Sequence, residues 1–176
     1  MKKLMIASAI AMTMTAGSAM ASQQGEIQFF GNVTAQTCDL VPEIGGAVNN
    51  MLQLGTVTTN SGSGTTHQGQ AIEFTLKAKD AGACTDAAQL GATIAWDGNL
   101  GAQGVVNQGG QAADAHVVLL AKNATTVDTQ ITSAKNFAEF TKDKLAGEGY
   151  KFSAQLIGGA TPGDFQSASA YAVTYK

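Results

Sequence analysis

The sequence predicts an all-β sandwich, and three observations support this fold class. Apolar and polar residues alternate with a period of two in several short segments, which is typical of strands with one buried face. Glycine-rich stretches separate these segments, and the chain holds 21 glycines but only two prolines. Charged residues make up only 13% of the chain, and long amphipathic helical patterns are scarce.

Residues 1–21 have the pattern of a signal peptide. Lys2 and Lys3 give a positive start, residues 4–16 are apolar, and Ala-Met-Ala at positions 19–21 matches a cleavage site. The apolar run is shorter than the roughly 18 residues that a membrane-spanning helix needs. We therefore expect cleavage after Ala21, which leaves 155 of the 176 residues as one exported domain.

The mature chain is expected to be acidic. Two of the ten lysines lie in the signal, so eight lysines remain against 13 acidic residues, a formal charge of −5, and the chain has no arginine. Binding to nucleic acid or to anionic membranes through charge is therefore not expected.

The first expected strand of the mature chain lies in residues 27–33. Ile27, Phe29, Gly31 and Val33 fall on one side of an extended segment. Glycine in this register would let the backbone of the segment approach a neighbouring surface closely.

Later strands follow in chain order. Leu52 and Leu54 alternate before a glycine, and residues 72–76 alternate between apolar and polar side chains. Residues 92–96 are apolar and end at the turn signal Asp97-Gly98. Each of these segments is expected to form a strand.

Three further strands are predicted in the second half of the mature chain, and the secondary structure of one segment stays undecided. Residues 116–121 form a continuous apolar run of the kind that is buried on both faces. Residues 150–157 and 169–176 are expected to be strands. Residues 134–145 fit either a helix, with Phe137 and Phe140 at i,i+3, or an irregular strand.

Glycine-rich loops are expected to connect these strands. They span residues 60–64, 98–110 and 158–163.

Cys38 and Cys84 are expected to form a disulfide bond. Two cysteines in an exported chain are most simply paired with each other. The alternative, a reactive or metal-bound pair, has little support, because CxxC spacing is absent and no histidine lies close to either cysteine in the sequence.

No catalytic, cofactor-binding or metal-binding motif is found in the sequence. His67 lies in a polar loop and His116 opens an apolar strand, and neither has a partner at the spacing of metal ligands. Trp96 fits a core position better than an exposed platform for a sugar, because it continues an apolar strand. We therefore expect a non-enzymatic protein without a cofactor.

Residues 25–38, GEIQFFGNVTAQTC, resemble the start of the mature subunits of chaperone/usher fimbriae. In that family, a pattern G-x-hydrophobic-x-F-x-G-x-V precedes a cysteine seven residues after the second glycine. The resemblance continues through residues 52–55 (LQLG), residues 72–76 (IEFTL) and the tail YAVTYK at 171–176 with its penultimate tyrosine. In general layout the chain is similar to the major subunits of enteric fimbriae whose shaft protein itself binds sialylated glycolipids.

The resemblance implies an incomplete immunoglobulin-like sandwich that lacks its last strand and is completed by a donated strand. Residues 22–35 would be the N-terminal donor-strand extension, and residues 36–176 the pilin domain. The donor residues would be Ile27, Phe29, Gly31 and Val33. The groove strand that also contacts the chaperone would carry Tyr171, Val173, Tyr175 and Lys176.

The same resemblance implies the partners and the location. They would be identical or related pilin subunits, a periplasmic chaperone and an outer-membrane usher, on a route through the periplasm to the cell-surface fimbrium. The expected function is non-covalent polymerisation by donor-strand exchange, which supports cell adhesion. Since 155 residues hold only the pilin domain, a two-domain tip adhesin is not expected.

A second hypothesis makes the shaft subunit itself a glycan-binding adhesin. An acidic sugar of the host would then contact Trp96 and lysines such as Lys122, Lys135 or Lys142. A secreted enzyme is the third and weakest hypothesis.

Overall fold

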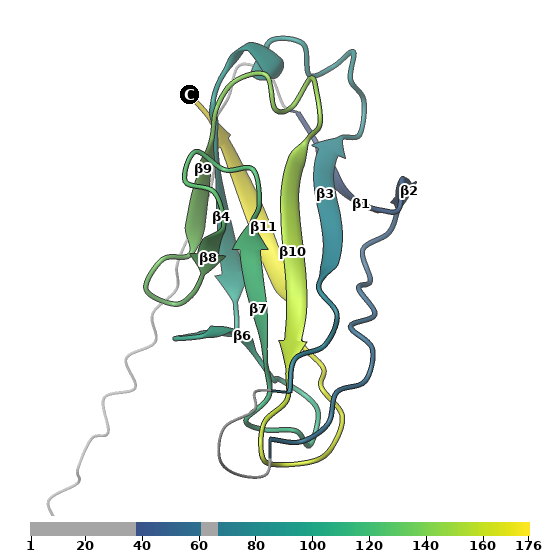
Figure 1. The fold of residues 1–176 in the computed structure, drawn as a ribbon. Coiled ribbons are helices and arrows are strands. Elements are labelled where there is room, and N and C mark those ends of the chain that lie inside the picture. Colours follow the sequence, from purple (N-terminus) through teal and green to yellow (C-terminus); the bar gives the residue numbers. More distant parts are fainter. Residues whose placement is uncertain (1–37, 61–66) are drawn as a thin grey trace, which may run out of the picture. The chain divides into compact units, whose positions relative to one another are not determined.

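The structure is a computed structural model that describes residues 38–60 and 67–176 (Figure 1). All of these residues belong to one compact unit, Asn32–Lys176. The expected strand at residues 27–33 lies outside the described residues. So does most of the expected loop at 60–64.

The described residues form an all-β sandwich of two antiparallel sheets, without an α-helix. The larger sheet has the order β2-β1-β3-β10-β7-β6-β5, with β8 beside β7, and the smaller sheet has the order β11-β4-β9. This arrangement confirms the predicted fold class. It is consistent with an immunoglobulin-like fold.

The larger sheet contains eight strands: β1 (Leu40–Ile44), β2 (Ala47–Val48), β3 (Ile72–Ala78), β5 (Leu100–Gly101), β6 (Gly104–Val106), β7 (His116–Ala121), β8 (Thr129–Ile131) and β10 (Tyr150–Ile157). The smaller sheet contains β4 (Ala92–Gly98), β9 (Phe137–Phe140) and β11 (Ser169–Tyr175). A 3-10 turn, η1 (Ala87–Gln89), precedes β4.

The predicted strands at residues 72–76, 92–96, 116–121, 150–157 and 169–176 are confirmed. The prediction of a strand at Leu52 and Leu54 is wrong, because this segment joins neither sheet. Instead, both leucines are partly buried and pack against the core. The apolar and polar side chains of this segment therefore alternate as they do in a strand, although the segment is not part of a sheet.

The open question at residues 134–145 is resolved in favour of a strand. β9 pairs with β4, and its residues alternate, with Ala138 and Phe140 buried and Phe137 exposed. The predicted loop at residues 98–110 is wrong in part, since β5 and β6 form a short hairpin within it. The continuous apolar run of β7 is buried on one face and only half-buried on the other, which corrects the prediction of burial on both faces.

Aromatic rings fill the space between the two sheets. Phe152 of the central strand β10 stacks on Phe74 with centroids 5.5 Å apart, and it meets the edge of Trp96 at 5.2 Å. Phe140 completes the cluster by packing on Phe152 and on Tyr150. Trp96 is therefore a core residue, as its place in an apolar strand predicted.

The predicted disulfide is present. Cys38 and Cys84 are bonded, with Cα atoms 5.0 Å apart across 46 positions of sequence. Cys84 is 2% exposed and belongs to the core. The bond attaches the segment before β1 to the turn that leads into η1.

Candidate functional site

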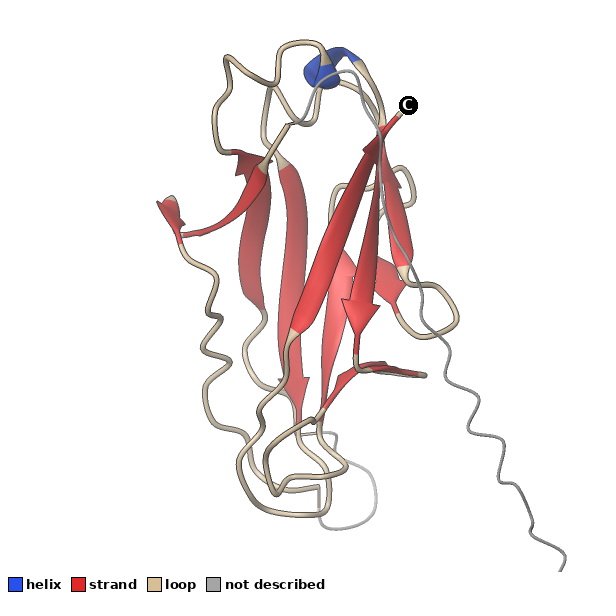
Figure 2. Ribbon diagram, turned by 180° about the vertical axis from the view of Figure 1, so that it is seen from behind, coloured by secondary structure: helices blue, strands red, loops and turns tan. Residues whose placement is uncertain are grey.

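The last strand, β11, lies at the edge of the smaller sheet. It pairs residue by residue with β4, from Ser169 opposite Gly98 to Tyr175 opposite Ala92. In the described part of the chain, the sheet continues from β4 to β9 but not beyond β11. In Figure 2, β11 is the strand that ends at the C-terminal label.

The inward face of β11 is incompletely covered. Ser169, Tyr171, Val173 and Tyr175 lie on this face, and all four are only partly buried. The residues opposite them on β4 include Ile94, which is fully buried. An apolar strand face that remains half-exposed beside a closed core indicates a place where further packing can occur.

A cavity of about 310 Å³ opens beside this face. Its lining is mostly apolar and includes Phe74, Leu76 and Trp96 of the core, together with Leu52, Leu54 and Tyr171. An apolar cavity of about 150 Å³ is known to hold a benzene-sized group. This cavity therefore has room for more than one apolar side chain.

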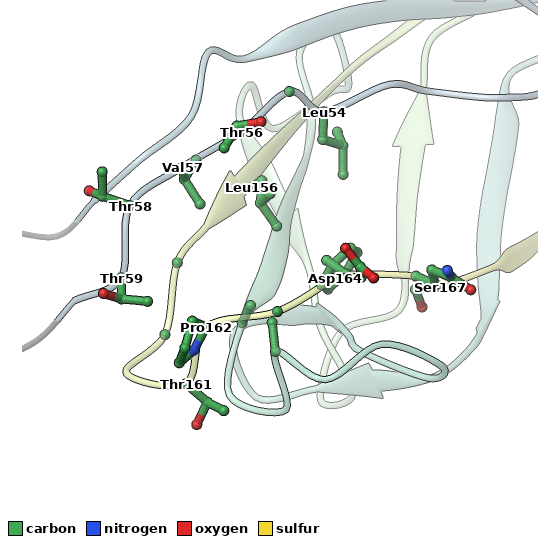
Figure 3. Close-up of a pocket in the computed structure, with 18 of the residues that line it drawn as sticks. Leu54, Thr56, Val57, Thr58, Thr59, Leu156, Thr161, Pro162, Asp164 and Ser167 are labelled. Carbon is green, nitrogen blue, oxygen red and sulfur yellow. The ribbon is translucent and has the colours of Figure 1, made fainter.

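A second cavity of about 1050 Å³ continues from the first (Figure 3). The two share Leu52, Leu54, Phe165 and Ser167. The segment of residues 51–59 lines one side of the larger cavity, and the loop of residues 158–167 lines the other. We call the two cavities together the groove.

Two tyrosines of β11 contact β1 and the segment just before it. The hydroxyl of Tyr171 donates a hydrogen bond to the carbonyl oxygen of Leu40 at 2.9 Å, and that of Tyr175 to the carbonyl oxygen of Cys38 at 3.5 Å. Burial, and then the charge of Asp39, raise the pKa of Tyr175 to about 12 and also raise the pKa of Tyr171. Both hydroxyls therefore stay protonated donors at neutral pH.

The C-terminal residue is held from two sides. The backbone N–H of Lys176 donates to the carbonyl of Gly91, and its own carbonyl oxygen accepts from the N–H of Gly91, both at 2.9 Å. Its ammonium group lies 2.5 Å from a carboxylate oxygen of Glu139. This hydrogen bond and charge lower the pKa of Glu139.

The structure brings some of the predicted site residues together and leaves others apart. Tyr171, Val173 and Tyr175 share the inward face of β11, and Tyr171 among them lines the groove, whereas Lys176 follows β11 and is exposed. The predicted donor residues Ile27, Phe29, Gly31 and Val33 lie outside the described residues.

Trp96, one of the residues named for glycan binding, lies in the core. Trp96 is only 6% exposed, so its ring is not a platform for a sugar. Lys122 forms an ion pair with Asp128.

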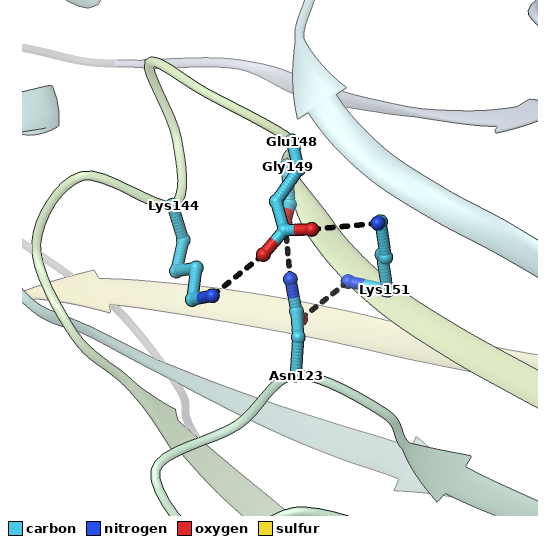
Figure 4. A network of polar contacts seen from close by, with 5 residues as sticks. All are labelled: Asn123, Lys144, Glu148, Gly149 and Lys151. Atoms are coloured by element: carbon cyan, nitrogen blue, oxygen red, sulfur yellow. Dashed lines mark hydrogen bonds and ion pairs between the residues drawn. The ribbon is translucent and has the colours of Figure 1, made fainter.

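A polar cluster at the start of β10 contains two further lysines (Figure 4). Glu148 accepts hydrogen bonds from Lys144 and Lys151, each at 2.6 Å, and these bonds lower its pKa to about 2. Asn123 binds the carbonyl of Gly149 and the N–H of Lys151. The lysine charges are thus partly neutralised within the cluster, whose contacts join the loop before β10 to the loop after β7.

The sequence did not predict the hydrogen bonds of Tyr171 and Tyr175. It also did not predict that the loop of residues 158–167 lines the larger cavity. One signal for the first was available, because Tyr171 and Tyr175 recur on one face of the last strand. Their acceptors could not be found in this way, because they are backbone oxygens more than 130 positions away.

In residues 38–60 and 67–176, no group of three or more histidine, cysteine or acidic side chains is placed to hold a metal ion. Nor does this part of the chain contain a helix long and apolar enough to cross a membrane.

Comparison with known proteins identifies the family. No protein-family model matches the chain. It is 49% identical to the F107 fimbrial protein of Escherichia coli over 177 aligned positions, which cover 100% of both chains. It is also 30% identical to the K99 fimbrial protein of Escherichia coli, with 99% of each chain covered. The chain therefore belongs to the family of fimbrial proteins.

Proposed function

We propose that this protein is the structural subunit of a surface fimbria and polymerises by donor-strand exchange. The observation that carries the proposal is the half-covered inward face of β11 beside an apolar cavity of about 310 Å³. An extended segment of another subunit, added along β11, would cover this face by β-augmentation.

Residues 25–33 of a second copy are the proposed occupant of the groove. Ile27, Phe29 and Val33 offer three apolar side chains on one side of the segment, with Gly31 between them. Residues 27–33 and β11 are both seven residues long, about 23 Å when extended. Burial of each apolar side chain contributes roughly 1.5 to 3 kcal/mol before the cost of ordering the segment.

The proposal includes a route to the cell surface. Residues 1–21 would direct export, residues 22–35 would be the donor extension and residues 36–176 the pilin domain. A periplasmic chaperone would cover the groove first, an outer-membrane usher would receive the subunit, and the fimbria would support adhesion. The exposed strand edge supports the need for a chaperone, because such an edge promotes aggregation when left open.

The glycan-binding alternative has less support. Trp96 lies in the core, and Lys122 is paired with an acidic side chain. An enzymatic role has no supporting observation, and we propose that the protein is not an enzyme.

Replacement of Gly31 by leucine tests the proposed function. The new side chain would stand on the face of the extension that enters the groove, so polymerisation should stop or fall sharply. The subunit should still form its disulfide and remain soluble with its chaperone. Size analysis of the purified complex and the yield of surface fibres provide the measurements.

Gln28→Leu is the matched control, because residue 28 lies on the opposite face of the same extension. It should polymerise normally. Fibres at normal yield from Gly31→Leu would contradict the proposal. A Gly31→Leu subunit that never folds would also contradict it, since residues 25–33 would then belong to the subunit's own core.

A further inference from the structure

Backbone carbonyls in β1 and just before it accept hydrogen bonds from the subunit's own donors. The carbonyl of Asp39 accepts from the N–H of Lys79, the residue after β3, at 2.8 Å, so it points toward β3. Successive carbonyls of a strand point in opposite directions. The carbonyls of Leu40 and Pro42 in β1 therefore point away from β3. The carbonyl of Cys38, two residues before β1, accepts from the hydroxyl of Tyr175.

Each of these three carbonyls has a partner within the chain. Tyr175 and Tyr171 donate their hydroxyls to Cys38 and Leu40, and the N–H of Asn49 donates to Pro42 at 2.9 Å. Pro42 also has no N–H of its own to offer a neighbouring strand. Proteins protect edge strands in such ways, because open edges pair with other chains.

We propose that the hydroxyls of Tyr171 and Tyr175 form a latch beside the groove, which occupies the carbonyls of Leu40 in β1 and of Cys38 just before β1 until an incoming strand replaces them. The latch rests on the proposed function, with residues 25–33 of a second copy as the incoming strand. A strand that lies between β11 and β1 needs the same carbonyl oxygens for its own N–H groups. When this strand inserts, two of its backbone N–H groups therefore replace the two tyrosine hydroxyls as donors to these carbonyl oxygens.

This exchange affects the rate of insertion more than the final affinity. A hydroxyl–carbonyl bond is lost and an amide–carbonyl bond is gained, so the number of hydrogen bonds stays the same. The lost bond must weaken before the new bond forms, and this step slows insertion. The ring of Tyr171 packs against Trp96 with centroids 5.6 Å apart, so phenylalanine at position 171 would preserve the apolar contact.

Tyrosine-to-phenylalanine variants test the latch. The protein is the mature subunit, residues 22–176, at a concentration low enough to stay monomeric. The probe is a fluorescently labelled synthetic peptide of residues 22–35. The association rate is measured by fluorescence anisotropy for wild type, Tyr171→Phe, Tyr175→Phe and the double variant.

Tyr150→Phe is the matched control, because the Tyr150 hydroxyl is buried without a hydrogen-bond partner. We expect Tyr171→Phe to bind the peptide roughly two- to tenfold faster than wild type, the factor that corresponds to one net neutral hydrogen bond. Tyr175→Phe should show a smaller acceleration, since its bond is longer. Tyr150→Phe should match wild type.

The outcomes separate the latch from the proposed function. Equal or slower association of Tyr171→Phe and Tyr175→Phe, with the peptide still binding, overturns the latch alone. No binding to wild type or to any variant overturns both proposals. If the double variant does not fold, the association rates of the two single variants test the latch. The folding of each single variant is checked by disulfide formation and a thermal melt.

Discussion

At the scale of single residues, Asp114 connects two loops at one end of the groove. Its carboxylate accepts hydrogen bonds from the N–H groups of Ala160 at 2.5 Å and Thr161 at 3.1 Å. These bonds lower the pKa of Asp114. A side chain at Gly159 would collide with this carboxyl group, since a Cβ there would lie 2.3 Å from its Cγ. The loop of residues 158–163 therefore depends on a charged acceptor and on a glycine beside it.

The contribution of Asp114 to stability should depend on pH. Because the folded pKa is depressed, the stabilisation is present above the unfolded value, near 3.8, and is lost as the pH falls through the folded value. Asp114→Ala should speed amide exchange at Ala160 and Thr161 at neutral pH. The difference from wild type should shrink under acid conditions.

Hydrogen exchange followed by NMR at several pH values provides the measurement. Asp86→Ala is the control, since the Asp86 side chain makes no capping bond to η1. Equal protection of Ala160 in Asp114→Ala and wild type at neutral pH would contradict this role.

At the scale of elements, a hydrogen bond links β11 of the smaller sheet to β1 of the larger sheet beside the groove. Tyr171 of β11 lines the groove, and the hydroxyls of Tyr171 and Tyr175 donate to the carbonyls of Leu40 in β1 and of Cys38 just before β1. The C-terminal residue then pairs with Gly91 beside the start of β4. Loss of the last two residues would therefore remove both the second latch hydroxyl and the pairing with Gly91.

Removal of Tyr175 and Lys176 should prevent a stable complex with the chaperone and lead to degradation in the periplasm. The truncation shortens the strand that the chaperone is proposed to cover. Immunoblotting of periplasmic extracts, and co-purification with the chaperone, measure the effect.

Lys176→Ala is the control for the loss of charge. It removes the ion pair with Glu139 but retains the strand and the terminal carboxylate, so the complex should form. Normal accumulation of the truncated subunit with its chaperone would show that this part of the assignment is wrong.

At the scale of the whole molecule, the disulfide connects parts of the fold that are distant in sequence. It joins Cys38, at the start of the described residues, to Cys84 in the buried core. The segment before β1 is thereby anchored close to the C-terminal end of β11, where Tyr175 contacts the carbonyl of Cys38. The bond thus holds in place the residue whose carbonyl accepts the Tyr175 hydroxyl of the latch.

Replacement of both cysteines by serine should lower the free energy of unfolding by about 4 kcal/mol, the value for a loop of this length in the chain-entropy model. Denaturant unfolding followed by circular dichroism measures the loss. Wild type under reducing conditions is the control and should lose a similar amount. Two reactive thiols per chain in denatured, unreduced protein would contradict the assignment.

The sequence by itself determined the fold class, most of the long strands and the cysteine pair. Alternation is a local property, so it identified strands such as residues 72–76 and 150–157 directly. It failed at Leu52 and Leu54, because alternation cannot show whether a segment finds a hydrogen-bonded neighbour. It left residues 134–145 open, because two phenylalanines three positions apart fit either a helix or a strand.

Only the tertiary structure decided the groove and its contacts. The cavity of about 310 Å³ is lined by residues from Pro42 to Tyr171, and no local pattern relates residues so far apart. Likewise, the acceptors of Tyr171 and Tyr175 are backbone oxygens, which every residue possesses and which no sequence pattern can distinguish. The packing of the two sheets selects among them, because it alone determines which strand edges face each other.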